Sequence, residues 1–217
     1  MMSQAKNADI TDYVTNGILF WLDGIYNTAN GHDATSSIWE DLSGNEYSGI
    51  YRSVNIIGDN YFSPNGEGLT KNKAFQSDFT DAIKSGSTIE IVCEVDPINS
   101  RGTVFAASGN GIGTTYAYNG SMCFSSASSS ANQKSVALAS GVHYYNSSLW
   151  RDGLQQQNTL QRTSHSSAVV SRFFCYSSIT NNVFSGKVYA LRVYNRILTD
   201  AELTKNWLTD KKRFGIS

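Results

Sequence analysis

The chain has little proline, and it lacks long apolar runs. Only 2 of its 217 residues are proline, whereas 18 are glycine. This balance favours tight turns over a disordered, proline-rich linker. No stretch approaches the roughly 18–20 apolar residues of a membrane span, so we expect no membrane insertion.

The chain also lacks an excess of either charge. Its 17 Lys and Arg residues nearly balance 18 Asp and Glu residues, which leaves a formal net charge of −1. Proteins that bind nucleic acid or anionic membranes carry a basic surface that neutralises phosphate groups. We therefore expect neither partner.

Cysteine and histidine are too few and too scattered to suggest a metal centre. None of the cysteines or histidines has a neighbour at zinc-ligand spacing. Each cysteine lies among apolar or aromatic residues, and we expect buried free thiols. The residues are Cys93, Cys123, Cys175, His32, His143 and His165.

The chain contains turn signals at regular intervals, and short runs of β-branched and aromatic residues lie between them. This pattern predicts antiparallel strands. Asn119-Gly120 and Asp152-Gly153 stand between strand-like runs and predict type I′ hairpins. No change in composition marks a boundary, so we predict a single domain over residues 1–217, with 1–12 as a candidate flexible arm or linker.

Two segments allow finer predictions. In "STIEIVCEV" (87–95) strict alternation predicts a half-buried strand, with Glu90, Val92 and Glu94 on the solvated face. In "FSGKVYALRVYNRILTDAEL" (184–203) a strand over about 186–194 changes its apolar phase. This change indicates either a bulge near Tyr189–Ala190 or two covered faces.

A helix follows that strand. Thr199 and Glu202 fit a capping box, and Gly215 can end the helix. We expect Leu203, Trp207 and Leu208 to form one buried stripe, and Trp21, Trp39 and Trp207 to lie in the core.

The 184–203 segment resembles the closing strand and helix of laminin-G-like, concanavalin A-like domains. "GILFWLDG" (17–24), "IWEDLSGNEYSG" (38–49), "STIEIVCEV" and "SLWRDGL" (148–154) are similar to further family segments and occur in the family's order. The resemblance implies an all-β, two-sheet antiparallel jelly-roll sandwich with one short C-terminal helix.

The resemblance also bears on calcium. Tyr189 stands where many members of the family have an aspartate that helps to hold a structural calcium ion. Asp23 and Asp41 remain candidate ligands. We expect no cofactor, with calcium as the alternative.

Catalysis has one candidate motif. Glucanases of this architecture resemble one another in an E-x-D-x-E strand, and Glu90 and Glu94 match its outer acids, whereas Val92 replaces the middle one. The two glutamates lie roughly 13 Å apart in an extended strand. Glycosidase carboxylates are about 5–9.5 Å apart. We therefore expect no catalytic residues.

A sugar site combines a flat aromatic ring with hydrogen-bonding groups. The loop after the first strand and the 114–124 hairpin offer such sets, and Tyr144, Tyr145 and Trp150 are further aromatic candidates. The predicted ligand-binding residues are Asp23, Tyr26, Asn27, His32, Asp33, Tyr116 and Tyr118.

These features predict a non-catalytic glycan-binding or adhesion module. We expect it on a cell exterior or a virion surface, without its own signal peptide, plausibly as a phage tail component that recognises a host surface glycan. The alternatives are a decoration domain that docks other structural proteins of an assembly and, less favoured, a glycoside hydrolase. A homo-oligomer is compatible with the sequence.

Overall fold

The computed structural model describes residues 10–45, 47, 49–50, 56–63, 69–71, 86–96, 102–107, 115–118, 120–124, 134–156, 170–174 and 184–217. These residues form antiparallel sheets and one C-terminal α-helix, which confirms the predicted all-β class. No helix among them is long and apolar enough to cross a membrane.

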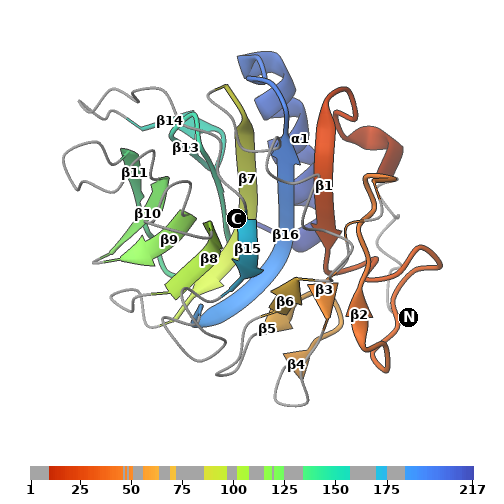
Figure 1. Ribbon diagram of the computed structural model, residues 1–217. Helices are drawn as coiled ribbons and strands as arrows, with labels where there is room; N and C mark the ends of the chain where they lie inside the picture. The colour runs from red at the N-terminus through yellow and green to blue at the C-terminus, as the bar shows by residue number, and fades with distance from the viewer. Residues whose placement is uncertain are drawn as a thin grey trace, which may run out of the picture.

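The first sheet has eight strands in the described residues and carries the helix on one face (Figure 1). Its central strand, β16, pairs with β7 on one side and with β1 and β5 on the other. The strands are β1 (Ile18–Asp23), β4 (Ile56–Ile57), β5 (Phe62–Ser63), β7 (Thr88–Val95), β12 (His143–Asn146), β13 (Trp150–Arg151), β14 (Leu154–Gln155) and β16 (Gly186–Tyr194).

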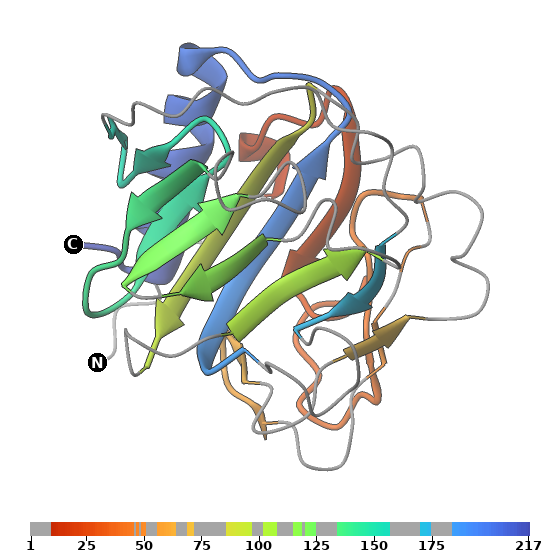
Figure 2. The same ribbon diagram turned by 60° about the vertical axis from the view of Figure 1, so that its left-hand side comes forward.

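The second sheet lies in front of the first when the molecule is turned (Figure 2). It also has eight strands in the described residues, in the order β11-β10-β9-β8-β15-β6-β3-β2. They are β2 (Ile38–Trp39), β3 (Gly49–Ile50), β6 (Leu69–Lys71), β8 (Gly102–Ala107), β9 (Thr115–Tyr118), β10 (Ser121–Phe124), β11 (Lys134–Ala137) and β15 (Val170–Phe173).

Both predicted hairpins form. Asp152 and Gly153 have φ angles of 51° and 78°, the left-handed pair that a type I′ turn requires. In the other hairpin Tyr118 pairs with Ser121 across a two-residue loop, and Gly120 has a φ of 73°.

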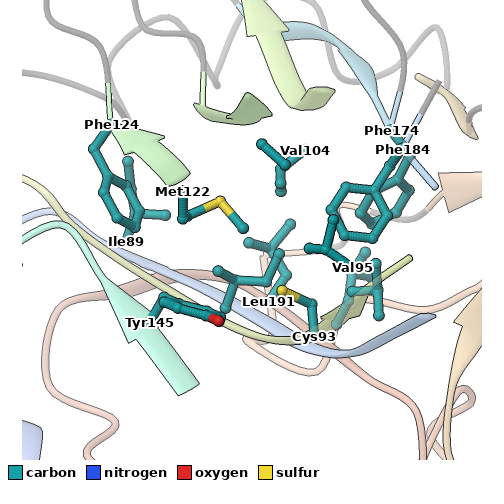
Figure 3. Packing of buried hydrophobic residues seen from close by; sticks show 14 of the residues in the cluster. Ile89, Cys93, Val95, Val104, Met122, Phe124, Tyr145, Phe174, Phe184 and Leu191 are labelled. Atoms are coloured by element: carbon teal, nitrogen blue, oxygen red, sulfur yellow. The ribbon is translucent and has the colours of Figure 1, made fainter. Parts of the chain in front are cut away.

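The main core lies between the two sheets (Figure 3). Ile89, Cys93 and Leu191 of the first sheet face Val104 and Met122 of the second. The prediction that Trp21, Trp39 and Trp207 are core residues is confirmed. Cys93 and Cys123 are buried free thiols, as predicted, and Cys175 lies outside the described residues.

The prediction of a half-exposed β7 is wrong for two of its three outer residues. Glu90 and Val92 are fully buried, and Glu94 alone keeps partial exposure. The cause is helix α1 (Asp200–Phe214), which covers the outer face of the first sheet. For β16, the bulge and the two covered faces predicted as alternatives both occur, with the register shift between Val188 and Ala190.

The ends of α1 follow the sequence signals, but its buried stripe differs from the prediction. Thr199 and Glu202 form the capping box, and Gly215 ends the helix with a φ of 66°. Leu203 and Trp207 are buried, whereas Leu208 is 57% exposed. Leu208 lies five residues after Leu203, so it points away from the sheet. Polar Asn206 and Asp210 complete the buried stripe.

Candidate functional site

The loop between β1 and β2 is held in one shape by its own hydrogen bonds. Thr28 and Gly31 form an isolated β-bridge at its tip. The Asn27 side chain donates to the Asp33 carbonyl (2.8 Å) and accepts from the Asp33 amide (2.7 Å). The Asn27 carbonyl in turn accepts from the Glu40 amide (2.9 Å). The loop is therefore preorganised before any ligand arrives.

Asp23 has a supporting role that the sequence did not indicate. Its carboxylate is fully buried, accepts from the amides of Ile25 and Tyr26 (3.0 Å each) and forms an ion pair with Arg213 (2.5 and 2.9 Å). Its carbonyl accepts from the Trp39 indole (2.9 Å). Asp23 and buried Asn27 are both predicted ligand contacts, but in the structure they hold the loop in place through other protein groups.

The other three predicted loop residues reach the surface. His32 and Asp33 are exposed, and the half-buried ring of Tyr26 lies against the Arg213 guanidinium (5.6 Å). Asp33 Oδ1 accepts from the hydroxyl and the amide of Thr35 (2.6 and 2.8 Å). These bonds lower the pKa of Asp33 below its usual value. The Ser36 amide contributes to this shift as well. The Thr35 bonds both end on Oδ1, and the carboxylate is exposed, so Oδ2 remains accessible to a ligand.

The hairpin candidates lie elsewhere. Tyr116 and Tyr118 belong to β9 of the second sheet, on either side of buried Ala117. Their side chains lie outside the described residues. The structure does not bring Tyr144, Tyr145 and Trp150 to the surface, because all three are buried.

The candidate calcium positions do not converge. The Asp41 carboxylate accepts hydrogen bonds from the amides of Trp21, Ser43 and Tyr47. Tyr189 packs against the ring of Phe214 (5.7 Å). Throughout the described ranges, no group of three His, Cys, Asp or Glu side chains could hold a metal ion.

A buried charge network lies between the first sheet and α1, and sequence reasoning missed it. Arg192 donates to Glu90 (2.8 Å) and forms a bidentate pair with Asp210. Tyr144 and Asn206 also donate to Glu90 (2.5 and 3.0 Å). Burial alone would lower the pKa of Arg192, but the carboxylates of Asp210 and Glu90 raise it well above its usual value.

Tyr13 joins this network to the loop. Its hydroxyl donates to Asp210 (2.7 Å) and accepts from Arg213 (3.0 Å), which holds Asp23. The loop that carries Tyr26 is therefore tied through Asp23 and Arg213 to the same helix that covers the sheet.

The two glutamates of the catalytic motif are both engaged. Glu90 is fully buried, whereas Glu94 is partly exposed and pairs with Lys187 (3.0 Å). Glu94 also accepts from the Tyr189 hydroxyl (3.4 Å). A substrate could reach Glu94 but not Glu90.

Comparison with known proteins identifies similar folds but no family. No family model and no curated protein matches the chain. A Trypanosoma rangeli sialidase in complex with 2,3-difluorosialic acid is similar with a TM-score of 0.60 and 17% identity, over 94% of this chain and 35% of that one.

Two botulinum toxin structures are also similar. The binding domain of neurotoxin DC, in complex with rat synaptotagmin II, has a TM-score of 0.56 and 10% identity, over 90% of this chain and 52% of that one. A structure of botulinum neurotoxin type C, whose cell entry depends on interaction with two ganglioside molecules, has a TM-score of 0.53 and 10% identity, over 90% of this chain and 52% of that one. At such identities the likeness shows the fold alone. The chain spans about a third of the sialidase and about half of the toxin structures.

Proposed function

We propose that this protein is a non-catalytic glycan-binding module, and that the loop surface formed by Tyr26, His32 and Asp33 contacts the sugar. The observation that carries this proposal is the oriented Asp33 carboxylate, with one accessible oxygen, on a loop that also presents an aromatic ring. A carboxylate oxygen accepts hydrogen bonds from sugar hydroxyls, and an aromatic ring packs against the apolar face of a sugar.

The rigidity of the loop supports binding. The two hydrogen bonds between the Asn27 side chain and the Asp33 backbone, together with the Asp23–Arg213 ion pair, hold the loop in one conformation. Little conformational entropy is therefore lost when a ligand binds. A single loop of this kind binds a sugar weakly, but several copies of the protein on one particle can bind one polysaccharide with high overall avidity.

The charge of this surface favours a neutral glycan. The carboxylates of Asp33 and Glu40 both belong to the loop region, and the Arg213 cation beneath Tyr26 is already paired with Asp23. His32 of this surface is cationic only when it is protonated, and it lies beside Asp33. A sialylated or uronic acid sugar would bring its own carboxylate against Asp33. The sialidase and the ganglioside-dependent toxin among the similar structures support sugar recognition in general, but not an anionic sugar here.

The burial of Glu90 supports a binding role over hydrolysis. A carboxylate enclosed by Arg192, Tyr144 and Asn206 cannot reach a polysaccharide. If polysaccharide turnover is nevertheless detected and disappears in Glu94→Gln, the hydrolase alternative is correct.

The fold proposal is a concanavalin A-like, laminin-G-like jelly roll, supported by the two facing antiparallel sheets and the capped closing helix. We further propose an adhesive role on a cell exterior or a virion surface, such as a phage tail component that recognises its host.

The experiment is a glycan array probed with the protein displayed multivalently. We expect binding to a neutral glycan, and a loss of at least ~10-fold in affinity in Asp33→Asn. Asp12→Asn is the matched control, because Asp12 is also an exposed aspartate and lies outside the loop in sequence. Absence of binding at high display density, or equal effects of the two variants, would overturn the proposal.

A further inference from the structure

A second surface, remote in sequence from the loop, has features of a protein-docking site. It consists of Leu154 of β14 and Leu208, Lys205, Lys211 and Lys212 of α1; we call it the leucine–lysine surface. Leu154 is 70% exposed and Leu208 is 57% exposed. Exposed apolar surface that is rimmed by charged residues, as Leu208 is by the three lysines, marks interaction sites when it is contiguous.

The two leucines belong to elements that are packed together. Gly153 approaches α1 so closely that a Cβ atom there would lie 2.4 Å from the indole nitrogen of Trp207. Leu154 follows Gly153, and Leu208 follows Trp207. The β13–β14 hairpin and α1 therefore lie against each other, and each carries one exposed leucine next to this contact in sequence.

The lysines surround Leu208 at helical spacing. Lys205, Lys211 and Lys212 are three or four residues from Leu208, so they are its neighbours on the helix surface. All three are exposed, and none forms an ion pair with another described residue. Lys211 lies over the Trp207 ring (5.5 Å), and Lys205 donates to the Tyr13 carbonyl (3.5 Å). The acidic residues of α1 are either at its first turn or buried.

We propose that the leucine–lysine surface docks a protein segment that presents an apolar side chain between carboxylates. Acidic groups on the partner complement the unpaired lysines, and its apolar side chain covers the leucines. This surface uses none of the residues Tyr26, His32 and Asp33, so the two proposals can be tested separately.

The same features argue against other occupants. A symmetric pair of copies joined through this surface would set lysines against lysines. A membrane-binding helix inserts a whole apolar face, whereas the apolar face of α1 is already buried against the sheet. Branched leucines lack the flat face on which sugars pack.

The test is selection of peptides from a random displayed library on the immobilised full chain. We expect peptides with Asp or Glu on both sides of Leu, Phe or Trp, whose affinity falls at least ~10-fold in Leu208→Ser. Ile197→Ser is the matched control, because Ile197 is 66% exposed and lies before the opposite end of α1. Lys212→Glu should weaken the binding of the selected peptides. It should strengthen the binding of peptide versions in which Lys replaces the acidic residues.

Three results would overturn the proposal. The first is selection without an acidic–apolar consensus, or peptides that bind Leu208→Ser and wild type equally. The second is a dimer in sedimentation that Leu208→Ser dissociates, which would assign the surface to a second copy. The third is Leu208-dependent binding to vesicles of anionic lipid, which would assign it to a membrane.

Discussion

Replacing Arg192 by methionine should destabilise the fold more than any change to a surface arginine. The Arg192 side chain is 1% exposed and pairs with Glu90 and Asp210, which are both fully buried. Removing one partner of a buried ion pair costs about 3–5 kcal/mol. Because Arg192 serves two carboxylates, we expect the upper part of that range. This loss is a large fraction of the roughly 5–15 kcal/mol that holds a typical domain together.

The pH dependence of this loss distinguishes an ionic cause from lost packing. Burial raises the pKa of Asp210, and the positive charge of Arg192 opposes that shift. Without Arg192 the native pKa of Asp210 rises further. A carboxyl group with a raised native pKa stabilises the fold when it is protonated, and that stability is lost as the pH rises through the native pKa. The difference between variant and wild type should therefore shrink as the pH is lowered from neutral toward the usual pKa of an aspartate.

The assay is urea unfolding of both proteins across this pH range. Arg196→Met is the control, because Arg196 pairs with Glu202 at the surface, where such pairs contribute up to about 1 kcal/mol. The reasoning is refuted if Arg192→Met is no less stable than Arg196→Met, or if its loss of stability is the same at every pH.

Three further predictions concern single positions. Thr199→Ala removes the N-cap side chain that accepts from the Glu202 amide, and should lower the free energy of unfolding by about 1 kcal/mol in thermal or urea unfolding. Gly153→Ala adds a Cβ atom 2.4 Å from the Trp207 indole at a φ of 78°, and should cost about 1–3 kcal/mol; a stable variant with unchanged Trp fluorescence would contradict this. Cys93, whose pKa burial raises, should resist alkylation at neutral pH until urea unfolds the chain, and peptide mass spectrometry checks its labelling.

Features set by neighbouring residues could be predicted from the sequence. The capping box joins Thr199 to Glu202, and the type I′ turn depends on Asp152 and Gly153 alone. Both predictions are confirmed because the physical cause lies within a few residues. The bulge in β16 was also visible as a change in apolar phase.

Features set by distant residues could not be predicted. The alternation of β7 indicated a solvated face because nothing local shows that α1 covers Glu90, whose partner Arg192 is 102 positions away. Contacts between residues distant in sequence also determine the candidate site. The loop was correctly located between β1 and β2, but the inward orientation of Asp23 depends on Arg213, which is 190 positions away.

The central claim is that the loop binds a neutral glycan. The most direct test is a titration of the array-selected neutral glycan into the protein, monitored through the backbone amide chemical shifts in NMR spectra. We expect saturable shifts at Tyr26, His32 and Asp33, with none for the sialylated form of the same glycan. Shifts confined to Tyr116 and Tyr118, or no shift at saturating glycan, would contradict the assignment of glycan binding to the loop.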